Sequence, residues 1–414
     1  MNTSVLCIDI GTTSLKAALI NQEGKVLGLS RKKFLLRHTL HASKEWLPAL
    51  QNAVKEIFEK NEYLYADALC ISGNGPTLVS STGDTLLWNE QVPAALEYSG
   101  TSLFIPRLLA FKNRFSEIWN KSETVFSGPE YLIWLLTDKK CTILPEERFY
   151  QAYWTDETLS QAGFTQEDKA KIPPFLKTTQ KAGTLTRKAE SFLGFEKNGL
   201  KEGLEVYCGA PDFISALAGT ATVFPGKLCD RAGSSEGINL CTEKPITGKN
   251  IRTLPSVIPG LWNASILLTE SGVQYSLFKK KIERENGGRI SYEDLTKLCI
   301  EQNTDESLAQ GRLLMEETAL YVKDAIAQLK ASWQEAECSF SFPKEMVITG
   351  GQSYNPLWSQ MKANVTGTTI FTPECGDAEL CGNAVFAFTG MKIFTSIQEG
   401  AVKLFRTAQT FIPE

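Results

Sequence analysis

The sequence predicts an α/β protein of two domains with mixed sheets, and three observations support that prediction. The chain has 414 residues, which is more than one hydrophobic core ordinarily serves, so two domains of about 200 residues each are expected. Apolar residues make up 43% of the chain and charged residues 22%, as in folded globular proteins. Strand, helix and strand patterns follow one another over residues 5–75, and a similar layout returns near the midpoint.

The first domain is expected to begin with three short strands, over residues 5–10, 15–20 and 25–30. Turn-forming residues separate these strands. A helix should follow to about residue 60, because apolar residues from Trp46 to Phe58 recur at helical spacing behind an N-cap at Ser43. The next strand covers residues 68–72. A strand meander followed by a helix and another strand predicts a mixed sheet.

The second half of the chain is expected to repeat this layout. Residues 226–241 contain two strands around a turn of small residues, and later a strand over 345–349 precedes a short helix. A long helix lies between them, with apolar residues from Leu314 to Leu329 on one face. We interpret residues 100–200 as a helical insertion that completes the first domain. The predicted domains are therefore residues 1–221 and residues 222–414.

Composition and charge exclude several classes of function. The net charge of −4 and the pI near 5.6 give none of the basic surface that nucleic-acid-binding proteins use. No run approaches the roughly 18 apolar residues that a membrane span needs, and the first residues lack the pattern of a signal peptide. The ten cysteines are scattered without a C-x-x-C pair, which favours reduced thiols. We therefore expect a cytoplasmic protein that binds neither nucleic acid nor membrane.

The first candidate site is the turn after the opening strand, which reads D-I-G-T-T-S-L-K over residues 9–16. Gly11 allows a tight turn and lets a phosphate approach without a Cβ in the way. Backbone N–H groups and the hydroxyls of Thr12 and Thr13 can donate hydrogen bonds to phosphate oxygens. Asp9, at the end of a buried strand, is placed to hold Mg²⁺ through water. Gly-Thr-Thr alone would indicate a plain hairpin, but the full pattern after an apolar strand favours phosphate binding.

The second candidate is Asp212, which opens a helix of small side chains after G-A-P over residues 209–211. The chain has only two histidines, so a general base is expected to be a carboxylate. A carboxylate at the positive end of a helix stays ionised. The more common role of such an Asp is an N-cap, and the two roles are compatible.

Two further turns of small residues carry weaker signals. Gly233, Ser234 and Ser235 lie between two strands, where the alternative is an ordinary hairpin. Gly350 and Gly351 follow a strand and precede a helix. Paired glycines can let a flat ring lie against the backbone, or they can simply end the strand.

Together, these four segments in this order resemble the FGGY family of carbohydrate kinases, within the superfamily of sugar kinases, Hsp70 and actin. The most specific parts are D-I-G-T-T-S-L-K over residues 9–16, G-G-Q-S-Y-N-P-L-W-S-Q-M-K-A-N-V-T-G over 350–367 and D-A-E-L-C-G-N-A-V over 377–385. The resemblance implies two actin-like (ribonuclease H-like) domains with a cleft between them. Residues 1–221 would form the sugar-binding domain and residues 222–414 the nucleotide-binding domain.

The resemblance also implies roles for particular residues. Asp212 would be the general base that accepts the proton of the sugar hydroxyl, because phosphoryl transfer needs positioning, charge stabilisation and one proton acceptor. ATP and Mg²⁺ would be the cofactors, with Asp9 anchoring the metal through water. The phosphates would be bound by Gly11, Thr12, Thr13, Gly233, Ser234 and Ser235. The adenosine would be bound by Gly350, Gly351, Gln352 and Asn355, with Gln352 standing where the family has a third glycine.

The expected sugar pocket departs from the family pattern. Xylulokinases usually carry Gln-Met-His-Gly where residues 72–77 read S-G-N-G-P-T, and no basic residue closely follows L-W-N over residues 87–89. The segment around residues 80–100 is also shorter than is usual in the family. The sugar contacts would be Asn74, Gly75, Trp88, Asn89 and Asp212, although packing in the core is an alternative for Trp88.

The overall pattern is closest to xylulokinase-like members, which implies transfer of phosphate to a ketopentose such as D-xylulose. Ribulose, gluconate and glycerol stay open as other acceptors. A kinase of poor turnover and a non-catalytic nucleotide-dependent switch are the remaining alternatives. The partners would be the small sugar and ATP, and a homodimer is a compatible assembly.

Overall fold

The computed structural model of the protein describes residues 3–37, 39–59, 64–92, 98, 100–194, 203–233, 235–269, 271–301 and 306–414. They form two compact units. Unit 1 is Met1–Ser215 with Glu379–Leu404, and unit 2 is Ala216–Ala378 with Phe405–Glu414. These units differ from a contiguous division at residue 221, because residues 379–404 join unit 1. The assignment of a sugar-binding and a nucleotide-binding domain stays a prediction.

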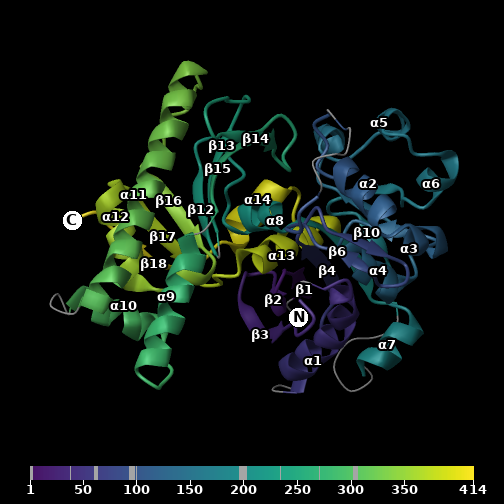
Figure 1. The fold of residues 1–414 in the computed structure, drawn as a ribbon, viewed down its shortest axis with the longest axis horizontal. Helices are drawn as coiled ribbons and strands as arrows, with labels where there is room; N and C mark the ends of the chain where they lie inside the picture. The colour runs from purple at the N-terminus through teal and green to yellow at the C-terminus, as the bar shows by residue number, and fades with distance from the viewer. Residues whose placement is uncertain are drawn as a thin grey trace. The chain divides into compact units, whose positions relative to one another are not determined.

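A six-stranded mixed sheet forms the centre of unit 1, in the order β10-β11-β4-β1-β2-β3 (Figure 1). Strands β1, β4 and β11 are parallel, whereas β2, β3 and β10 pair antiparallel with their neighbours. Every residue of β1 and β4 is buried, as expected for parallel strands covered on both faces. The strands are β1 (Ser4–Ile10), β2 (Ser14–Asn21), β3 (Val26–Lys33), β4 (Ala68–Gly73), β10 (Lys181–Thr184) and β11 (Glu205–Pro211).

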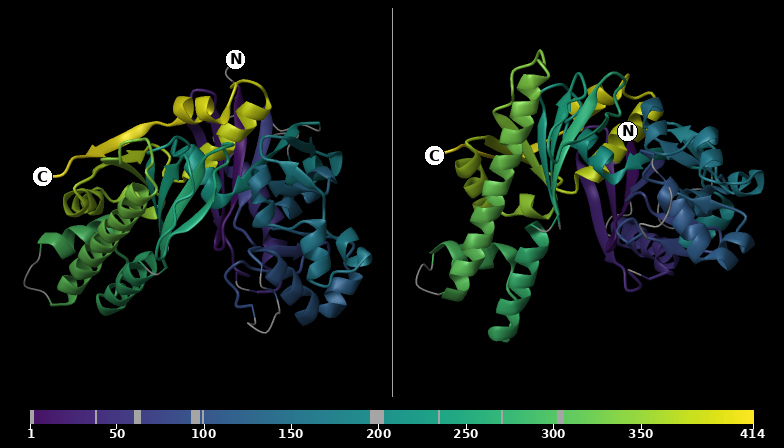
Figure 2. Two further views of the ribbon diagram at one scale, coloured as in Figure 1. Left: turned by 90° about the horizontal axis from the view of Figure 1, so that it is seen from above. Right: turned by 45° about the horizontal axis from the view of Figure 1, so that its top comes forward.

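Unit 2 contains a seven-stranded mixed sheet, in the order β14-β15-β13-β12-β16-β17-β18 (Figure 2). Its five central strands repeat unit 1, since β15-β13-β12-β16-β17 has the same pairing directions as β3-β2-β1-β4-β11. The structure therefore confirms the predicted α/β class and its internal repeat. The strands are β12 (Leu228–Ala232), β13 (Glu236–Thr242), β14 (Arg252–Pro255), β15 (Trp262–Leu268), β16 (Glu345–Thr349), β17 (Thr369–Pro373) and β18 (Thr407–Phe411).

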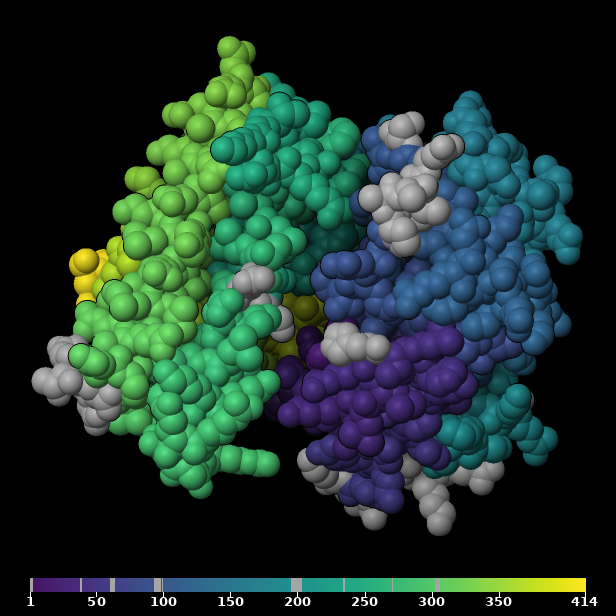
Figure 3. All heavy atoms as spheres, viewed as in Figure 1, coloured from purple at the N-terminus to yellow at the C-terminus, as the bar shows by residue number. Residues whose placement is uncertain are grey.

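Helices α11 (Glu306–Glu335) and α12 (Pro356–Thr366) pack against strands of the unit 2 sheet, and the atoms of α11 are light green in Figure 3. Met315, Val322 and Leu329 are buried on one face of α11, as the helical spacing predicts. The other helical elements are α9 (Ser271–Glu285), α10 (Tyr292–Glu301) and the 3-10 turn η4 (Gly351–Tyr354). None of the helices in the described ranges combines the length and the apolar character needed to cross a membrane.

The insertion expected between residues 100 and 200 belongs to unit 1. It is mostly helical, as predicted, but it also contains three short strands outside the main sheet. Strands β8 and β9 pair with each other, and β7 joins β5 and β6, which precede the insertion, in a three-stranded sheet β6-β5-β7. Its helices are α2 (Ile105–Arg114), α3 (Ser116–Lys121), α4 (Glu130–Thr137), η2 (Glu147–Gln151), α5 (Asp156–Gln161), α6 (Gln166–Ala170) and α7 (Arg187–Leu193). The small strands are β5 (Leu78–Ser80), β6 (Thr85–Leu86), β7 (Val125–Phe126), β8 (Thr142–Leu144) and β9 (Phe175–Lys177).

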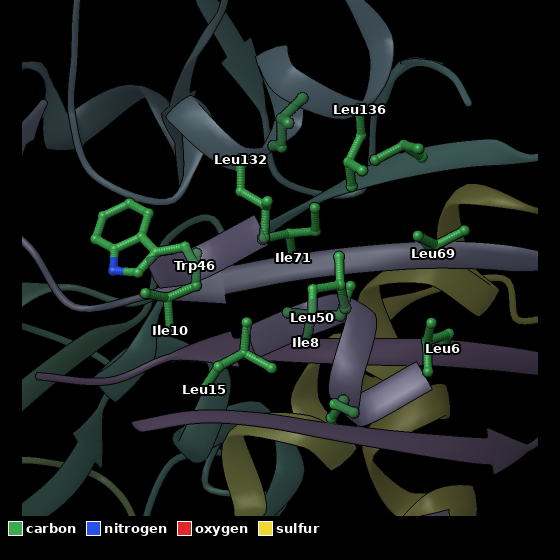
Figure 4. Close-up of a cluster of buried hydrophobic side chains, with 14 of the residues drawn as sticks. Leu6, Ile8, Ile10, Leu15, Trp46, Leu50, Leu69, Ile71, Leu132 and Leu136 are labelled. Carbon is green, nitrogen blue, oxygen red and sulfur yellow. The ribbon is translucent and has the colours of Figure 1, made fainter. Parts of the chain in front are cut away.

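The main core of unit 1 lies between its sheet and two helices, α1 (Trp46–Glu59) and α4. Leu50 of α1 and Leu132 of α4 pack with Ile8 and Ile71 of the central strands (Figure 4). Burial of each such side chain stabilises the fold by about 1.5–3 kcal/mol. The remaining helical elements of unit 1 are η1 (Ala42–Glu45), α8 (Asp212–Gly219), which continues into unit 2, α13 (Ala378–Gly390), which begins one residue before the unit 1 segment, and α14 (Ile397–Leu404).

Glu130, the first residue of α4, is a buried carboxyl group. One of its oxygens accepts hydrogen bonds from the Ile143 N–H (2.7 Å) and from the Ser127 hydroxyl (2.9 Å). The other oxygen is buried and has no hydrogen-bond partner among the described residues. Burial raises the pKa of Glu130 to about 7.

We expect Glu130→Gln to stabilise the protein at pH 8 and to change its stability little at pH 5. The folded state holds the Glu130 proton up to a pKa of about 7, whereas the unfolded chain releases it near 4.5. The free energy of unfolding therefore falls as the pH rises from 4.5 to 7, by up to about 3 kcal/mol. Glutamine can accept the same two hydrogen bonds without a charge. Thermal unfolding at the two pH values measures the difference.

A matched control is Glu123→Gln, because Glu123 is exposed and lies 3.7 Å from Lys140. This control should show no difference between the two pH values. A Glu130→Gln variant no more stable than the wild type at pH 8 would contradict the expectation.

Candidate active site

The carboxyl ends of three parallel strands lie along one edge of the unit 1 sheet. The register places Ile10 of β1 opposite Gly73 of β4, and Gly73 opposite Pro211 of β11. Ligands of α/β sheets bind outside the carboxyl ends of such strands. Asp9, Asn74 and Asp212, which lie at or directly after these ends, are therefore brought to the same edge.

The turn between β1 and β2 is closed by a hydrogen bond from the Gly11 N–H to the Ser14 carbonyl oxygen (3.0 Å). A Cβ at Gly11 would lie 3.1 Å from the same oxygen, so the tight turn favours glycine. Thr13 is exposed and Thr12 is half-buried. Because the Gly11 N–H is used within the turn, Thr12 and Thr13 are the residues through which this turn can donate to a phosphate.

The Thr12 hydroxyl accepts two hydrogen bonds, from Asn74 Nδ2 (3.1 Å) and from Trp88 Nε1 (2.8 Å). A hydroxyl has two acceptor positions and one donor hydrogen. Both acceptor positions are occupied, so the Thr12 hydroxyl is left to act as a donor. An oxygen of a phosphate or of a sugar can accept a hydrogen bond from such a donor.

Asn74 and Trp88 are fixed by the same small network. The Thr77 hydroxyl donates to Asn74 Oδ1 (2.8 Å) and accepts from the Trp88 N–H (3.1 Å). The Trp88 side chain is 42% exposed, so it does not pack in the core. Gly75 and Asn89 are exposed in the loops that follow Asn74 and Trp88. The structure thus brings the expected sugar contacts of these two loops beside the expected phosphate turn.

Asp9 lies in a cluster of charges at the end of β1. Its carboxyl group is 2% exposed and accepts from the Ser72 hydroxyl (3.0 Å). Lys16 Nζ lies 3.7 Å from Asp9 Oδ2 and 3.5 Å from Glu379 Oε2 of α13. Burial raises the pKa of Asp9 to about 7 against the opposing charge of Lys16, and the negative charges of Glu379 and Asp212 act in the same direction as burial.

This charge balance fits a divalent cation. Asp9 and Glu379 share one lysine, the charge of Asp212 adds to the repulsion at Asp9, and a bound cation would offset that repulsion. Within the described ranges, no three acidic, histidine or cysteine side chains are spaced to surround a metal directly. Mg²⁺ usually keeps several waters and is held by one or two carboxylates together with phosphate oxygens. Asp9 therefore fits the role of a water-mediated anchor.

Asp212 is the first residue of α8 and is half-buried. Its Oδ1 accepts from the Phe213 N–H at 2.6 Å. The carboxylate therefore interacts with the start of the helix, and its partial exposure leaves it within reach of a substrate hydroxyl. The predicted roles of cap and base are both compatible with this position.

Asn383 of α13 was not singled out from the sequence, although it lies within the D-A-E-L-C-G-N-A-V segment. Its side chain is fully buried, and Nδ2 donates to the Ile8 carbonyl oxygen (2.8 Å) and to Ser72 Oγ (2.9 Å). Ser72 in turn donates to Asp9 Oδ1. A Cβ at Gly209 would lie 2.8 Å from Asn383 Oδ1, so glycine is needed where β11 passes α13. A lone amide in a run of small apolar residues was the available signal.

Arg107 of α2 was also missed. Its guanidinium is 6% exposed and donates to the carbonyl oxygens of Leu87 and Glu90. The family pattern has a basic residue shortly after the position of Trp88. In this structure, Arg107 reaches that loop from farther along the chain. Arg107 supports the loop that carries Trp88 and Asn89.

In unit 2, two glycine-containing turns touch each other. The β12–β13 hairpin is closed by a hydrogen bond from the Gly233 N–H to the Ser235 carbonyl oxygen (3.0 Å). Gly350 has a φ of +89°, and a Cβ there would lie 2.6 Å from the Ala232 carbonyl oxygen and 3.4 Å from the Gly233 nitrogen. Gly350 therefore requires glycine both for its backbone angle and for this close approach. Ser234, the remaining predicted phosphate residue, lies outside the described residues.

The other three residues expected at the adenosine differ in exposure. Around Gly351, a Cβ would meet no heavy atom of the described chain within 4 Å, so its backbone is accessible. Gln352 is 8% exposed and donates to the Glu236 carboxylate. Asn355 is 4% exposed, caps α12 by accepting from the Trp358 N–H (3.3 Å) and donates to Thr296 Oγ1 (2.7 Å). The side chains of Gln352 and Asn355 thus have partners inside unit 2, and their contact with adenosine stays a prediction.

The repeated α/β sheet, with a turn of small residues at the same place in each unit, defines an actin-like two-domain fold. Solved structures with this fold include xylulose kinase from Lactobacillus acidophilus, with a TM-score of 0.78, 15% identity and coverage of 100% of this chain and 94% of that chain. Another is Plasmodium falciparum glycerol kinase with ADP, with a TM-score of 0.77, 13% identity and the same coverage.

Comparison of sequences adds a relative and a family to which the chain is similar. An autoinducer-2 kinase of Escherichia coli is 23% identical over 492 residues, which cover 99% of this chain and 90% of that protein. Residues 285–391 match the C-terminal domain of the FGGY family of carbohydrate kinases. This match, and the similarity to the autoinducer-2 kinase over nearly the whole chain, agree with the resemblance to the FGGY family that the sequence motifs indicate.

Proposed function

We propose that this protein transfers the γ-phosphoryl group of ATP to a hydroxyl group of a small sugar, with a ketopentose such as D-xylulose as the first candidate acceptor. The observation that carries the proposal is the edge of the unit 1 sheet. There a half-buried carboxylate, Asp212, lies near a buried acidic cluster at Asp9. The Thr12 hydroxyl at the same edge is restricted to donation.

These residues match what phosphoryl transfer requires. A bond forms between the sugar oxygen and the γ-phosphorus, the bond from that phosphorus to the β,γ-bridging oxygen breaks, and ADP leaves. Asp212 accepts the proton of the sugar hydroxyl. Thr12 and Thr13 donate to phosphate oxygens, and Asp9 holds Mg²⁺ through water. Neutralisation of the phosphate charge is the chemistry that Mg²⁺ would supply when bound.

The nucleotide is assigned to unit 2. The turns at Gly233 and at Gly350–Gly351 present backbone and small side chains, on which phosphates and a flat base can lie. A solved structure of the same fold is a glycerol kinase with ADP, which supports an adenine nucleotide as the ligand. We also propose a cytoplasmic location, because ATP is available there and all ten cysteines are thiols.

The acceptor is assigned to the loops of Asn74, Gly75, Trp88 and Asn89. The exposed Trp88 indole offers a flat apolar surface, and the neighbouring amides and the Thr12 hydroxyl offer hydrogen bonds, which is the mixture that small-molecule sites use. Relatives named for xylulose and for autoinducer-2 show that acceptors differ among similar proteins. Autoinducer-2 is the second candidate acceptor, because the E. coli relative carries that name.

A panel of acceptors tests the proposal by coupled ADP release with Mg²⁺ and ATP. The panel contains D-xylulose, D-ribulose, D-gluconate, glycerol and autoinducer-2. We expect D-xylulose to stimulate ADP release above the rate with ATP alone, and a phosphorylated product to accumulate in equal amount. If another compound of the panel stimulated ADP release and D-xylulose did not, that compound would replace D-xylulose as the proposed acceptor. ADP binding without stimulation by any member would contradict the kinase proposal and favour a nucleotide-dependent switch.

A further inference from the structure

Four polar side chains are buried together in unit 2, and we call them the Lys362 cluster. They are Asp230 of β12, Glu236 of β13, Gln352 of η4 and Lys362 of α12. Lys362 Nζ lies 2.7 Å from Asp230 Oδ2 and 3.0 Å from Glu236 Oε2. Gln352 Nε2 donates to the other Glu236 oxygen, Oε1. The side chains of Lys362, Asp230 and Glu236 are at most 1% exposed.

Stability alone does not account for the Lys362 cluster. Removing charges from water costs several kcal/mol for each ion, and well-packed apolar residues of similar volume usually give equal or greater stability. A buried polar network can instead fix one arrangement of the elements that it joins, because each member has a defined partner and direction. The role of the Lys362 cluster therefore depends on the elements that it joins.

Glu236 connects the two turns that we assign to the nucleotide. It is the first residue of β13, pairs with Ala232 and directly follows the turn at residues 233–235. Gln352, its partner, directly follows Gly350 and Gly351. The two turns also meet through the backbone, where the Cβ position of Gly350 lies 2.6 Å from the Ala232 carbonyl oxygen. One carboxylate thus binds Gln352 through one oxygen and Lys362 through the other.

Lys362 connects a third element, α12, to the two turns. It lies on α12, which begins directly after the segment of Gly350 to Asn355. Through Asp230 and Glu236 it holds both strands of the β12–β13 hairpin to that helix. The hairpin, η4 and α12 are therefore held together by side chains that are buried inside unit 2.

We propose that the Lys362 cluster fixes the spacing between the phosphate turn at Gly233 and the adenosine turn at Gly350–Gly351, and that Gln352 and Lys362 are positioning residues for ATP. This inference rests on the proposed function, since that function assigns both turns to the nucleotide. In this view Gln352 acts through Glu236 and not by touching the adenine.

Gln352→Met tests the inference, because methionine has a similar volume and no hydrogen-bond donor. We expect the Kd for ADP and the KM for ATP to rise about 10-fold, which corresponds to about 1.4 kcal/mol and to the lower end of a hydrogen bond with a charged group. The KM for the sugar should stay unchanged, because the proposed sugar contacts belong to unit 1. Titration calorimetry with ADP and initial-rate kinetics give the two readouts.

Gln360→Met is the matched control, on α12, the helix that follows η4. Gln360 donates to Asn364 Oδ1 (2.7 Å) and to the Ile412 carbonyl oxygen (2.8 Å), so the control also removes hydrogen bonds within unit 2. It should leave the Kd for ADP unchanged. Gln352→Asn withdraws the amide from Glu236 by one methylene and should weaken ADP binding as Gln352→Met does. It supplies the measurement if the methionine variant does not fold.

The outcomes separate this inference from the function on which it rests. A wild-type protein that binds no ADP would overturn the proposed function, and the inference with it. If the wild type binds ADP and both Gln352 variants bind it equally well, the inference alone is overturned. It is also overturned if those variants raise the KM for the sugar as much as the KM for ATP, because that result indicates a general structural defect.

Discussion

Asp212→Asn is expected to reduce sugar-dependent ADP formation by about 10²–10⁴-fold, the usual contribution of a positioned general base, with ATP binding nearly unchanged. Asparagine keeps the size of the side chain and can still accept from the Phe213 N–H, as Asp212 Oδ1 does. It cannot accept the proton of a hydroxyl at neutral pH. Coupled ADP release measures the loss, and titration calorimetry with a nucleotide shows whether binding is retained.

The loss in Asp212→Asn could also arise through Asp9, because the negative charge of Asp212 contributes to the raised pKa of Asp9. Dependence on Mg²⁺ distinguishes the two routes. A loss through the base leaves the Mg²⁺ concentration for half-maximal rate unchanged, whereas a loss through Asp9 shifts it. Asp156→Asn, in unit 1 with its side chain 80% exposed, is the matched control and should keep full activity. Full activity of Asp212→Asn would contradict its role as base.

Much of the fold could be predicted because strands and turns are local features. The apolar runs that became β1 and β4 end in turn-forming residues, and the same pattern returns at β12 and β13. The position of α13 could not be predicted in this way. Its small apolar residues indicate burial, but they do not indicate which sheet will cover them. The contact is made by Asn383, whose partners Ile8 and Ser72 are more than 300 residues away in the sequence.

The candidate site was predictable to a similar extent. Asp9, Thr12 and Asp212 belong to short motifs, and the parallel strands bring them to one edge of the sheet. The direction of a side chain after a turn is a different matter. Gln352 is buried two residues after Gly350, whose φ is +89°, and a sequence does not specify that angle. The role of Arg107 also depends on the packing of α2 against a distant loop.

Lys362→Met is expected to lower the free energy of unfolding by about 3–5 kcal/mol, the usual cost of removing one partner from a buried ion pair. The variant leaves Asp230 and Glu236 buried without a cation. In the wild type, burial raises the pKa of Asp230 to about 7, the charge of Glu236 acts in the same direction, and Lys362 opposes both. Without Lys362, the pKa of Asp230 should rise further.

This further rise gives the destabilisation a pH dependence with a definite sign. A carboxyl group with a raised folded-state pKa favours the folded state less as the pH rises towards that pKa. Lys362→Met should therefore be more destabilising at pH 8 than at pH 5.5, as measured by urea unfolding at both values. Adding Asp230→Asn removes one of the two unpaired charges and should restore stability mainly at pH 8. Lys323→Met, at an exposed site of α11, should change the free energy of unfolding by less than about 0.5 kcal/mol.

Lys362 and Gln352, two of the four residues of the Lys362 cluster, should then behave differently. Lys362 carries the charge balance of the cluster, so its removal should lower the stability as well as weaken nucleotide binding. Gln352 is neutral and its replacement leaves the ion pairs of Lys362 in place, so its removal should appear mainly as weaker nucleotide binding. If Lys362→Met proved as stable as the wild type at pH 8, the buried charges would not depend on one another. The connection that Glu236 makes between the two turns would then lack its physical basis.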